Sequence, residues 1–401
     1  MATRTHQILP AIADDPYSDD VLADPYALFG RMRAAGPAVW LEKYQVPAFA
    51  RYAECRDILA DHGTFISGAG VGPKDLLKEP NWRPQGILES DPPRHTVMRN
   101  AMAGVISPKG TRALRAGFEA FAAQLLPELL ERGSIDGVKD LAEVFPLRAF
   151  GDAVGIPQEG REENLLTHGA MNFSHFGPEN ERHRYYFEQG AGTPEWVMDR
   201  TRRENLSPGG MGEQLWQYVD SGDLPAEMAP LVVRALLSAG LDTTVIGIGN
   251  ALKLFAEHPE QWSILRDNPR MVSLAINEVL RFESPFQSFY RTTSADTEIA
   301  GVSLPAGSKL ALFLGSANRD EAQFGPDADV FRIERDAASM IAFGNGIHRC
   351  VGQPITRLEM HVVLTWLAHN VERIEPAGEP VPYLHNTLKG YSSLPLRLLP
   401  A

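Results

Sequence analysis

Apolar residues recur at helical spacing along most of the chain. The longest such pattern runs from about residue 225 to residue 258, and residues 24–29 and 111–155 carry others. Another pattern begins at Gln353, after which one helical face is apolar at Ile355, Leu358, Val362, Val363, Trp366 and Leu367. These patterns predict a mainly α-helical protein.

Short apolar runs bounded by turn residues predict small β-sheets beside the helices. Residues 38–41 and 46–50 should pair as two strands near the start of the chain. Residues 298–304 and 309–314 should form strands on either side of a Pro-Ala-Gly turn at 305–307. The strands are few and short, so we expect them to be secondary to the helical body.

The chain offers no clear internal boundary. Residues 1–20 fit an irregular arm, a glycine-rich loop runs from 67 to about 90, and no repeat or low-complexity linker is present. The 401 residues are 44% hydrophobic and 22% charged, which is ordinary for a protein that buries a large core. We therefore expect a single domain over residues 1–401, mainly α with small β-sheets.

The charge and the N-terminus exclude several classes of protein. A net charge of −13 leaves no basic stripe that could neutralise phosphates, which argues against nucleic-acid binding. The N-terminus lacks the basic start and apolar run of a signal peptide, and no stretch reaches the roughly 18 apolar residues of a membrane span. We expect a cytoplasmic protein that contacts neither nucleic acid nor membrane.

Only two cysteines occur, which excludes a disulfide framework and a cysteine-rich zinc site. Cys55 lies within a short helical pattern and should be a core or half-buried thiol. Cys350 follows a glycine-rich turn and precedes the helix that begins near Gln353, so free N–H groups and the positive end of the helix dipole point at its sulfur. These conditions favour a thiolate, which can ligate haem iron; the alternative is an inert buried thiol.

The stretch around Cys350 resembles the haem-binding loop of cytochromes P450. It reads Phe-Gly-x-Gly-x-His-x-Cys-x-Gly over residues 343–352. Three further stretches resemble motifs of that family, in the family's order: residues 91–99, 239–244 and 278–281. The resemblance covers nearly the whole chain. It implies the cytochrome P450 fold, haem b (iron protoporphyrin IX) as cofactor, O2 as co-substrate, and a monooxygenase of the soluble bacterial class.

The resemblance also implies roles for individual residues. Cys350 would be the iron ligand, and Asp242 with Thr243 would deliver protons; without the resemblance, the latter two would be an ordinary polar helix face. The remaining haem-binding positions would be His95, Arg99, Arg291, Phe343, His348 and Gly352. A buried ion cluster of Glu278, Arg281 and Arg335 would hold the core around the haem.

A small aromatic substrate is expected from the residues that the resemblance places around the distal pocket. These candidates are Leu88, Phe173, Phe176, Ala235, Ala239, Phe286 and Phe289. The phenylalanines suit a flat ring, although core packing would explain Phe173 and Phe176 equally well. Several stretches resemble bacterial cytochromes P450 that O-demethylate para-methoxybenzoates. Hydroxylation of a methyl ether gives a hemiacetal that collapses to a phenol and formaldehyde.

The chain departs from that group where a carboxylate would bind. Arg83 is present, but Gln85 and Gly86 stand where a serine is expected, and Ala235 replaces another serine after Arg234. Because loss of hydroxyl donors leaves a buried anion poorly paired, we expect a neutral guaiacol or alkylguaiacol as substrate. An O-demethylase of 4-methoxybenzoate-type carboxylates is the alternative.

The electron supply and two other function classes complete the expectations. No flavin or iron–sulfur motif is present, so a ferredoxin and a ferredoxin reductase should supply electrons. A peroxide-driven peroxygenase would share Cys350 but would not need Asp242 or Thr243. A non-catalytic haem sensor would bind haem and gas without turnover.

Overall fold

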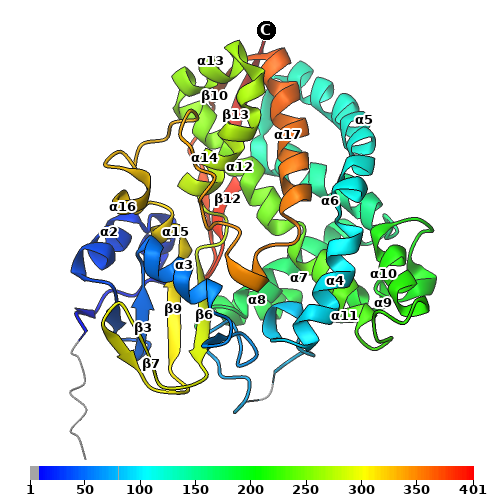
Figure 1. The fold of residues 1–401 in the computed structure, drawn as a ribbon. Helices are drawn as coiled ribbons and strands as arrows, with labels where there is room; N and C mark the ends of the chain where they lie inside the picture. Colours follow the sequence, from blue (N-terminus) through cyan, green and yellow to red (C-terminus); the bar gives the residue numbers. More distant parts are fainter. Residues whose placement is uncertain (1–8, 80) are drawn as a thin grey trace, which may run out of the picture.

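Helices make up most of the molecule, and the main sheet lies to one side of them. The computed structural model describes residues 9–79 and 81–401, and Figure 1 shows the helical body beside the sheet that carries the labels β3, β9 and β6. The prediction of a mainly α protein with small sheets is confirmed. The α-helices are α1 (Asp19–Ala23), α2 (Tyr26–Ala35), α3 (Tyr52–Ala60), α4 (Arg94–Val105), α5 (Pro108–Arg132), α6 (Val144–Val154), α7 (Arg161–Ser174), α8 (Glu181–Gly190), α9 (Thr193–Asp199), α10 (Met211–Asp220), α11 (Ala229–Ala239), α12 (Asp242–Glu257), α13 (Pro259–Asp267), α14 (Val272–Phe282), α15 (Leu314–Ala317), α16 (Glu321–Phe324) and α17 (Gln353–Asn370). The other helical segments are η1 (Ile87–Glu89), η2 (Gly137–Ala142), η3 (Arg203–Asn205), η4 (Pro269–Met271) and η5 (Gly346–His348).

The described strands form one larger sheet and three smaller ones. The larger sheet has the order β1-β2-β3-β9-β6-β4; the others are β10-β13-β5, β11-β12 and β7-β8. The strands are β1 (Ala11–Ile12), β2 (Val39–Leu41), β3 (Val46–Phe49), β4 (Phe65–Ile66), β5 (Ser134–Asp136), β6 (Ser288–Thr293), β7 (Thr297–Ile299), β8 (Val302–Leu304), β9 (Lys309–Phe313), β10 (Val371–Pro376), β11 (Val381–Leu384), β12 (Lys389–Ser393) and β13 (Pro395–Pro400).

The predicted strands are present, with one difference. β2 and β3 pair antiparallel with Val39 opposite Ala48, as expected. The run at 298–304 is a hairpin of β7 and β8 instead of one strand, because Ala300 and Gly301 both adopt positive φ (48° and 81°) and turn the chain. Of the predicted N-terminal arm, residues 1–8 lie outside the described part of the chain, and β1 adds to the larger sheet beside β2.

The longest predicted helix is interrupted near its centre. α11 ends at Ala239 and α12 begins at Asp242. A Cβ at Gly240 would lie 2.4 Å from the ring of Phe150, so glycine lets that ring pack against the break. The stretch Ala229–Glu257 is long and apolar enough for a membrane span, contrary to the sequence-based expectation. However, 78% of its most apolar window is buried inside the fold, which makes it a core helix pair.

The centre of the helical body is formed by α12, which contacts α14 and α17 (Figure 1). Its sequence is apolar on nearly all sides, and such a helix must be surrounded by other elements. The Thr244 hydroxyl lies 3.0 Å from that of Thr356 and joins α12 to α17. This contact therefore fixes α12, which carries Asp242 and Thr243, to α17, the helix that follows Cys350.

The predicted ion cluster beneath this core is present. The Arg281 Nε donates to Glu278 Oε2 at 2.7 Å, and the Arg335 Nε donates to Glu278 Oε1 at 3.2 Å. Glu278 and Arg281 are fully buried, and Arg335 is 6% exposed. The cluster fixes α14 to the segment that approaches the Cys350 loop. Cys55 is also buried, as predicted, and its sulfur donates to the Phe49 carbonyl.

Candidate active site

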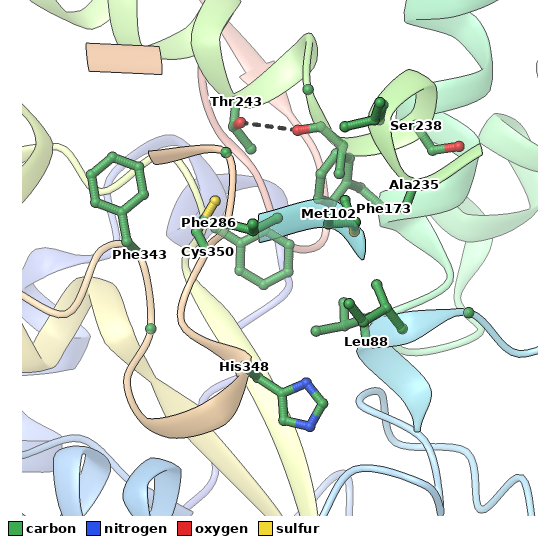
Figure 2. A pocket seen from close by; sticks show the side chains of 18 of the residues that line it. Leu88, Met102, Phe173, Ala235, Ser238, Thr243, Phe286, Phe343, His348 and Cys350 are labelled. Atoms are coloured by element: carbon green, nitrogen blue, oxygen red, sulfur yellow. Dashed lines mark hydrogen bonds between the residues drawn. The ribbon is translucent and has the colours of Figure 1, made fainter. Parts of the chain in front are cut away.

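One cavity of about 250 Å³ brings together segments that are far apart in sequence. Figure 2 shows Cys350 and His348 on one loop, Thr243 on the facing helix, and Leu88, Phe173 and Phe286 among the side chains around the space. Fifteen predicted site residues line it: Leu88, His95, Arg99, Phe173, Phe176, Ala235, Ala239, Thr243, Phe286, Phe289, Arg291, Phe343, His348, Cys350 and Gly352. Asp242, which is also in the described part of the chain, is not among the lining residues.

The loop that carries Cys350 is shaped by two glycines and by a backbone hydrogen bond. Gly344 and Gly346 have φ of 70° and 67°, a region in which other residues are strained. A Cβ at Gly346 would lie 2.3 Å from the Leu59 carbonyl oxygen, so this glycine also permits close contact with α3. The Cys350 N–H donates to the Phe343 carbonyl at 2.8 Å and closes the loop, and Cys350 lines the cavity.

The Cys350 side chain is exposed to the cavity, although its sulfur lies deep in the protein. Burial raises the pKa of this thiol, while the N–H groups of Gly352 and Gln353 and the nearby positive charge of Arg99 act against the shift. The predicted helix N-terminus is therefore in place, but its effect on the pKa of the Cys350 thiol is smaller than that of burial. Coordination to a metal ion would supply the stronger pull that removes the proton.

Four basic side chains face the cavity near this loop. Arg291 is 3% exposed, and its Nη1 donates to the neighbouring Tyr290 carbonyl; burial lowers its pKa to about 10. Burial also lowers the pKa of Arg99. The ring centroids of His95 and His348 lie 4.4 Å apart, and the Nε2 atom of each is buried without a hydrogen-bond partner. Among the described residues, no carboxylate forms an ion pair with either arginine.

This set of donors fits the carboxylates of a haem. Burial lowers the pKa of His348 to about 2, and Arg291, His95 and Arg99 add to the shift, so its imidazole is neutral and can donate one N–H. Asp91 acts on Arg291 and His95 through its charge but forms no ion pair with Arg291 among the described residues. A buried cation without an ion-pair partner is costly, and two propionates would supply one. The single sulfur, the glycine-shaped loop and these donors all fit one haem group.

Aromatic side chains form the wall of the cavity. Phe286 and Phe289 are stacked with ring centroids 4.0 Å apart, and the ring of Phe173 lies 5.5 Å from that of Phe286 and 6.1 Å from that of Phe176. All four rings line the cavity, so they do more than pack the core. The wall can hold a flat apolar ring through stacked and edge contacts.

A polar group of residues lies at another part of the same lining. The Arg83 Nη1 donates to Glu89 Oε2 at 2.7 Å, and their side chains are only 8% and 1% exposed. Arg234 is 6% exposed, and its Nη2 donates to the Pro84 carbonyl at 2.8 Å. Burial lowers the pKa of Arg234 to about 10; Arg83 adds to this shift and Glu89 opposes it. In this cluster, Arg83 therefore forms an ion pair with Glu89, whereas Arg234 donates to a backbone carbonyl.

Thr243 and Asp242 point to different surroundings although they are neighbours in sequence. Thr243 lines the cavity, and its hydroxyl lies 3.4 Å from the Ala239 carbonyl, a contact drawn in Figure 2. Asp242 is 6% exposed, and its Oδ2 atom is buried without a partner. Burial raises the pKa of this carboxyl well above its usual value, and Glu143 adds to the shift. The Asp242 carboxyl is therefore sheltered from solvent, whereas Thr243 faces the cavity.

Comparisons with known proteins identify the family. The sequence profile of cytochrome P450 matches residues 221–397. The chain is 46% identical to cytochrome P450 CYP199A2 of Rhodopseudomonas palustris over 395 residues, which cover 98% of this chain and 95% of that protein. The chain belongs to the cytochrome P450 family. The recognition, the fold, the monooxygenase class and the haem b cofactor predicted from sequence are thereby confirmed.

More distant cytochromes P450 share the same architecture. The monooxygenase PikC of Streptomyces venezuelae is 29% identical, with 94% of this chain and 92% of that protein covered. The solved structure of cytochrome P450 CYP109Q5 from Chondromyces apiculatus matches with a TM-score of 0.81 at 29% identity, covering 98% of this chain and 99% of that one. The arrangement of elements is therefore that of the family over nearly the whole length.

Sequence reasoning missed several residues of this cytochrome P450 cavity. Glu89, Met102, Asn172 and Ser238 line it, and the Ser238 hydroxyl is buried without a partner. Ser238 and Ala235 lie three apart on α11, so helical spacing could have indicated Ser238. No sequence signal shows that Glu89 turns back to pair with Arg83, because that contact depends on the path of the loop before α4.

Proposed function

We propose that this cytochrome P450 monooxygenase removes the methyl group from a small methoxylated aromatic compound, releasing formaldehyde and a phenol. The observation that carries the proposal is the wall of four phenylalanine rings in the cavity that Cys350 faces. A flat ring held against this wall could present a methyl ether towards the sulfur-bearing loop. The proposal treats residues 1–401 as one catalytic domain.

The roles of the haem-side residues follow from their chemistry. When bound, a thiolate-ligated haem supplies the activation of O2 and the transfer of one oxygen atom to a C–H bond. We assign Cys350 to ligate the iron, and Phe343 and Gly352 to shape the loop around it. His95, Arg99, Arg291 and His348 would pair with the propionates, since each faces the cavity and, among the described residues, neither arginine forms an ion pair with a carboxylate and the Nε2 atom of each histidine is without a partner.

Proton supply is assigned to the neighbouring pair on α12. The Thr243 hydroxyl faces the cavity and can pass a hydrogen bond to a group bound there. Asp242 lies outside the lining, and burial raises its pKa, so its carboxyl holds a proton that it can give up. A change of Thr243 to alanine should therefore reduce product formation and increase the release of hydrogen peroxide.

The favoured substrate is an uncharged guaiacol or alkylguaiacol. Glu89 neutralises Arg83, and Gly86 and Ala235 offer no side-chain hydroxyl beside the cluster. A substrate carboxylate would then have to pair with Arg234 alone. That arginine, which has no carboxylate in ion-pair contact among the described residues, is the observation that favours the second candidate, a 4-methoxybenzoate-type acid.

Binding titrations followed by the haem spin-state change separate the two substrates. We expect 4-propylguaiacol to bind the wild-type enzyme more tightly than 4-methoxybenzoate. Glu89→Gln should tighten binding of the acid about 10-fold, because it frees a buried positive charge, and should leave the guaiacol nearly unchanged. Tighter binding of the acid by the wild-type enzyme would overturn the neutral substrate and support the second candidate.

Turnover tests the reaction and its partners. We propose a ferredoxin and a ferredoxin reductase as electron donors in the cytoplasm, as is typical for bacterial members of the family. With them, formaldehyde and phenol should appear in equal amounts. Turnover driven equally well by hydrogen peroxide, and unaffected by Thr243→Ala, would instead indicate a peroxygenase. Haem binding without any product would indicate a sensor.

A further inference from the structure

A glycine on α7 faces the carboxyl group of Asp242. A Cβ built on Gly169 would lie 1.8 Å from Asp242 Oδ2, 2.5 Å from its Cγ and 2.8 Å from Oδ1. Non-bonded heavy atoms prefer separations of about 3.5–4.0 Å, so no other residue fits at 169 while the carboxyl stays where it is. The missing side chain of Gly169 leaves the space that the Asp242 carboxyl occupies.

The contact is specific to this side chain. All three nearest atoms to the built Cβ belong to the Asp242 side chain, and two of them are its carboxyl oxygens. At Gly190, for comparison, the nearest atoms belong to Met171. Where α7 approaches α12, the space beside Gly169 is therefore occupied by a carboxyl group.

The carboxyl in this space is sheltered and close to other ionisable groups. Asp242 is 6% exposed and its Oδ2 has no hydrogen-bond partner, so the protonated form is favoured. The charge of Asp242 contributes to raising the pKa of Tyr186 and of Tyr383, and Glu143 acts on Asp242 itself. Any displacement of the carboxyl would change both its hydration and its distance from Thr243.

We propose that Gly169 is a positioning residue that holds the Asp242 carboxyl against α7, from where it supplies protons towards Thr243. The inference rests on the proposed role of Asp242 in proton delivery. A methyl group at 169 would force the carboxyl to rotate out of its present place. The residue itself touches neither substrate nor cofactor, so its effect would act through Asp242.

The variants Gly169→Ala, Asp242→Asn and their combination test this inference. Gly117→Ala is the matched control, because a Cβ at that helical glycine meets nothing within 4 Å. With ferredoxin, reductase and a methoxylated aromatic, Gly169→Ala should lower product formation about 10-fold and raise the share of hydrogen peroxide. This is less than the roughly 10²–10⁴-fold effect of losing an acid–base group, because the carboxyl is displaced and not removed. In the Asp242→Asn variant, Gly169→Ala should cause little further loss, because the side chain at position 242 no longer carries an acid that can donate a proton.

Infrared spectroscopy gives a readout that does not depend on turnover. The C=O stretch of the protonated Asp242 carboxyl is assigned as the band that Asp242→Asn removes. Gly169→Ala should shift this band in the holoenzyme, and Gly117→Ala should leave it unchanged. An unshifted band, or an equal loss of turnover with and without Asp242, would overturn the role of Gly169. Normal turnover of Asp242→Asn would instead overturn the proposed role of Asp242.

A further variant covers the case in which Gly169→Ala does not fold. Combining it with Asp242→Ala removes the carboxyl and leaves room for the added methyl group. We expect this double variant to recover the unfolding midpoint of Asp242→Ala. A double variant that remains unfolded would show that position 169 is required for packing alone, which would overturn the inference.

Discussion

Two buried clusters of charge in this protein are built in opposite ways. In the first, Glu278 accepts hydrogen bonds from Arg281 and Arg335, so positive and negative groups meet within the protein. In the second, Arg99 and Arg291 face the cavity, and no carboxylate of the described residues forms an ion pair with them. The first cluster is complete without a cofactor, and the second requires an anion from outside the chain.

The difference separates the charges that stabilise the fold from those that we propose to bind the haem. A buried charge that is paired and hydrogen-bonded becomes costly only when one partner is removed. A buried charge that is left unpaired lowers stability until a ligand pairs with it, so part of the binding energy of that ligand goes into relieving this cost. Substitutions in the two clusters should therefore have opposite effects on the haem-free protein.

The largest effect is expected from Glu278→Gln. It leaves Arg281 and Arg335 without their shared carboxylate, and breaking a buried pair costs about 3–5 kcal/mol. The free energy of unfolding should fall by that amount in urea titrations, with or without haem. Glu334→Gln, on an exposed side chain of the same segment as Arg335, is the control and should have almost no effect. An unchanged midpoint for Glu278→Gln would remove the basis of the comparison.

Arg291→Gln should act in the other direction on the haem-free protein. Removing an unpaired buried cation should raise its free energy of unfolding by about 1–3 kcal/mol, whereas haem should dissociate about 10-fold faster. Urea titration of the haem-free form and transfer of haem to apomyoglobin measure the two quantities. A variant that is destabilised in the haem-free form would mean that Arg291 is satisfied within the protein.

Glu359 offers a smaller and pH-dependent test. It is fully buried on α17, neither carboxyl oxygen has a partner, and burial raises its pKa well above the usual value. The folded state therefore holds this proton more tightly than the unfolded state, so stability is lost as pH rises above the unfolded pKa of about 4.3. Glu359→Gln lacks that loss.

The advantage of Glu359→Gln over the wild type should grow between about pH 5 and pH 8, by at most about 1.4 kcal/mol per pH unit. Urea midpoints across this range measure it, and Glu379→Gln, at an exposed position, should show no such trend. A difference between Glu359→Gln and the wild type that stays constant with pH would show that Glu359 has an unseen partner.

Sequence predicted the parts of this protein that depend on local pattern or on a short motif. The helix from Gln353, the strand pair β2–β3 and the buried position of Cys55 all follow from apolar patterns within a few residues. The convergence of distant segments on one cavity came from the family resemblance, since no spacing rule relates His95 to Cys350.

Contacts that depend on the path of the folded chain were not predictable in this way. The Arg83–Glu89 pair requires the loop to turn back on itself through η1. The Asp242 carboxyl occupies the space that Gly169, a glycine in another helix, leaves open. The ring of Phe150 packs against Gly240 at the break between α11 and α12, and Phe150 lies on another helix, α6.

Gly346 limits how the protein could be re-engineered. A Cβ at this position would meet the Leu59 carbonyl oxygen, a backbone atom that cannot move aside as a side chain can. The backbone of Gly346 also has a positive φ of 67°, which other residues rarely adopt. Saturation mutagenesis of the haem loop should therefore return glycine at 346 in every active clone. Variation of substrate range has to come instead from the phenylalanine wall, where side chains of different size can be exchanged without disturbing the attachment of the iron-bearing loop.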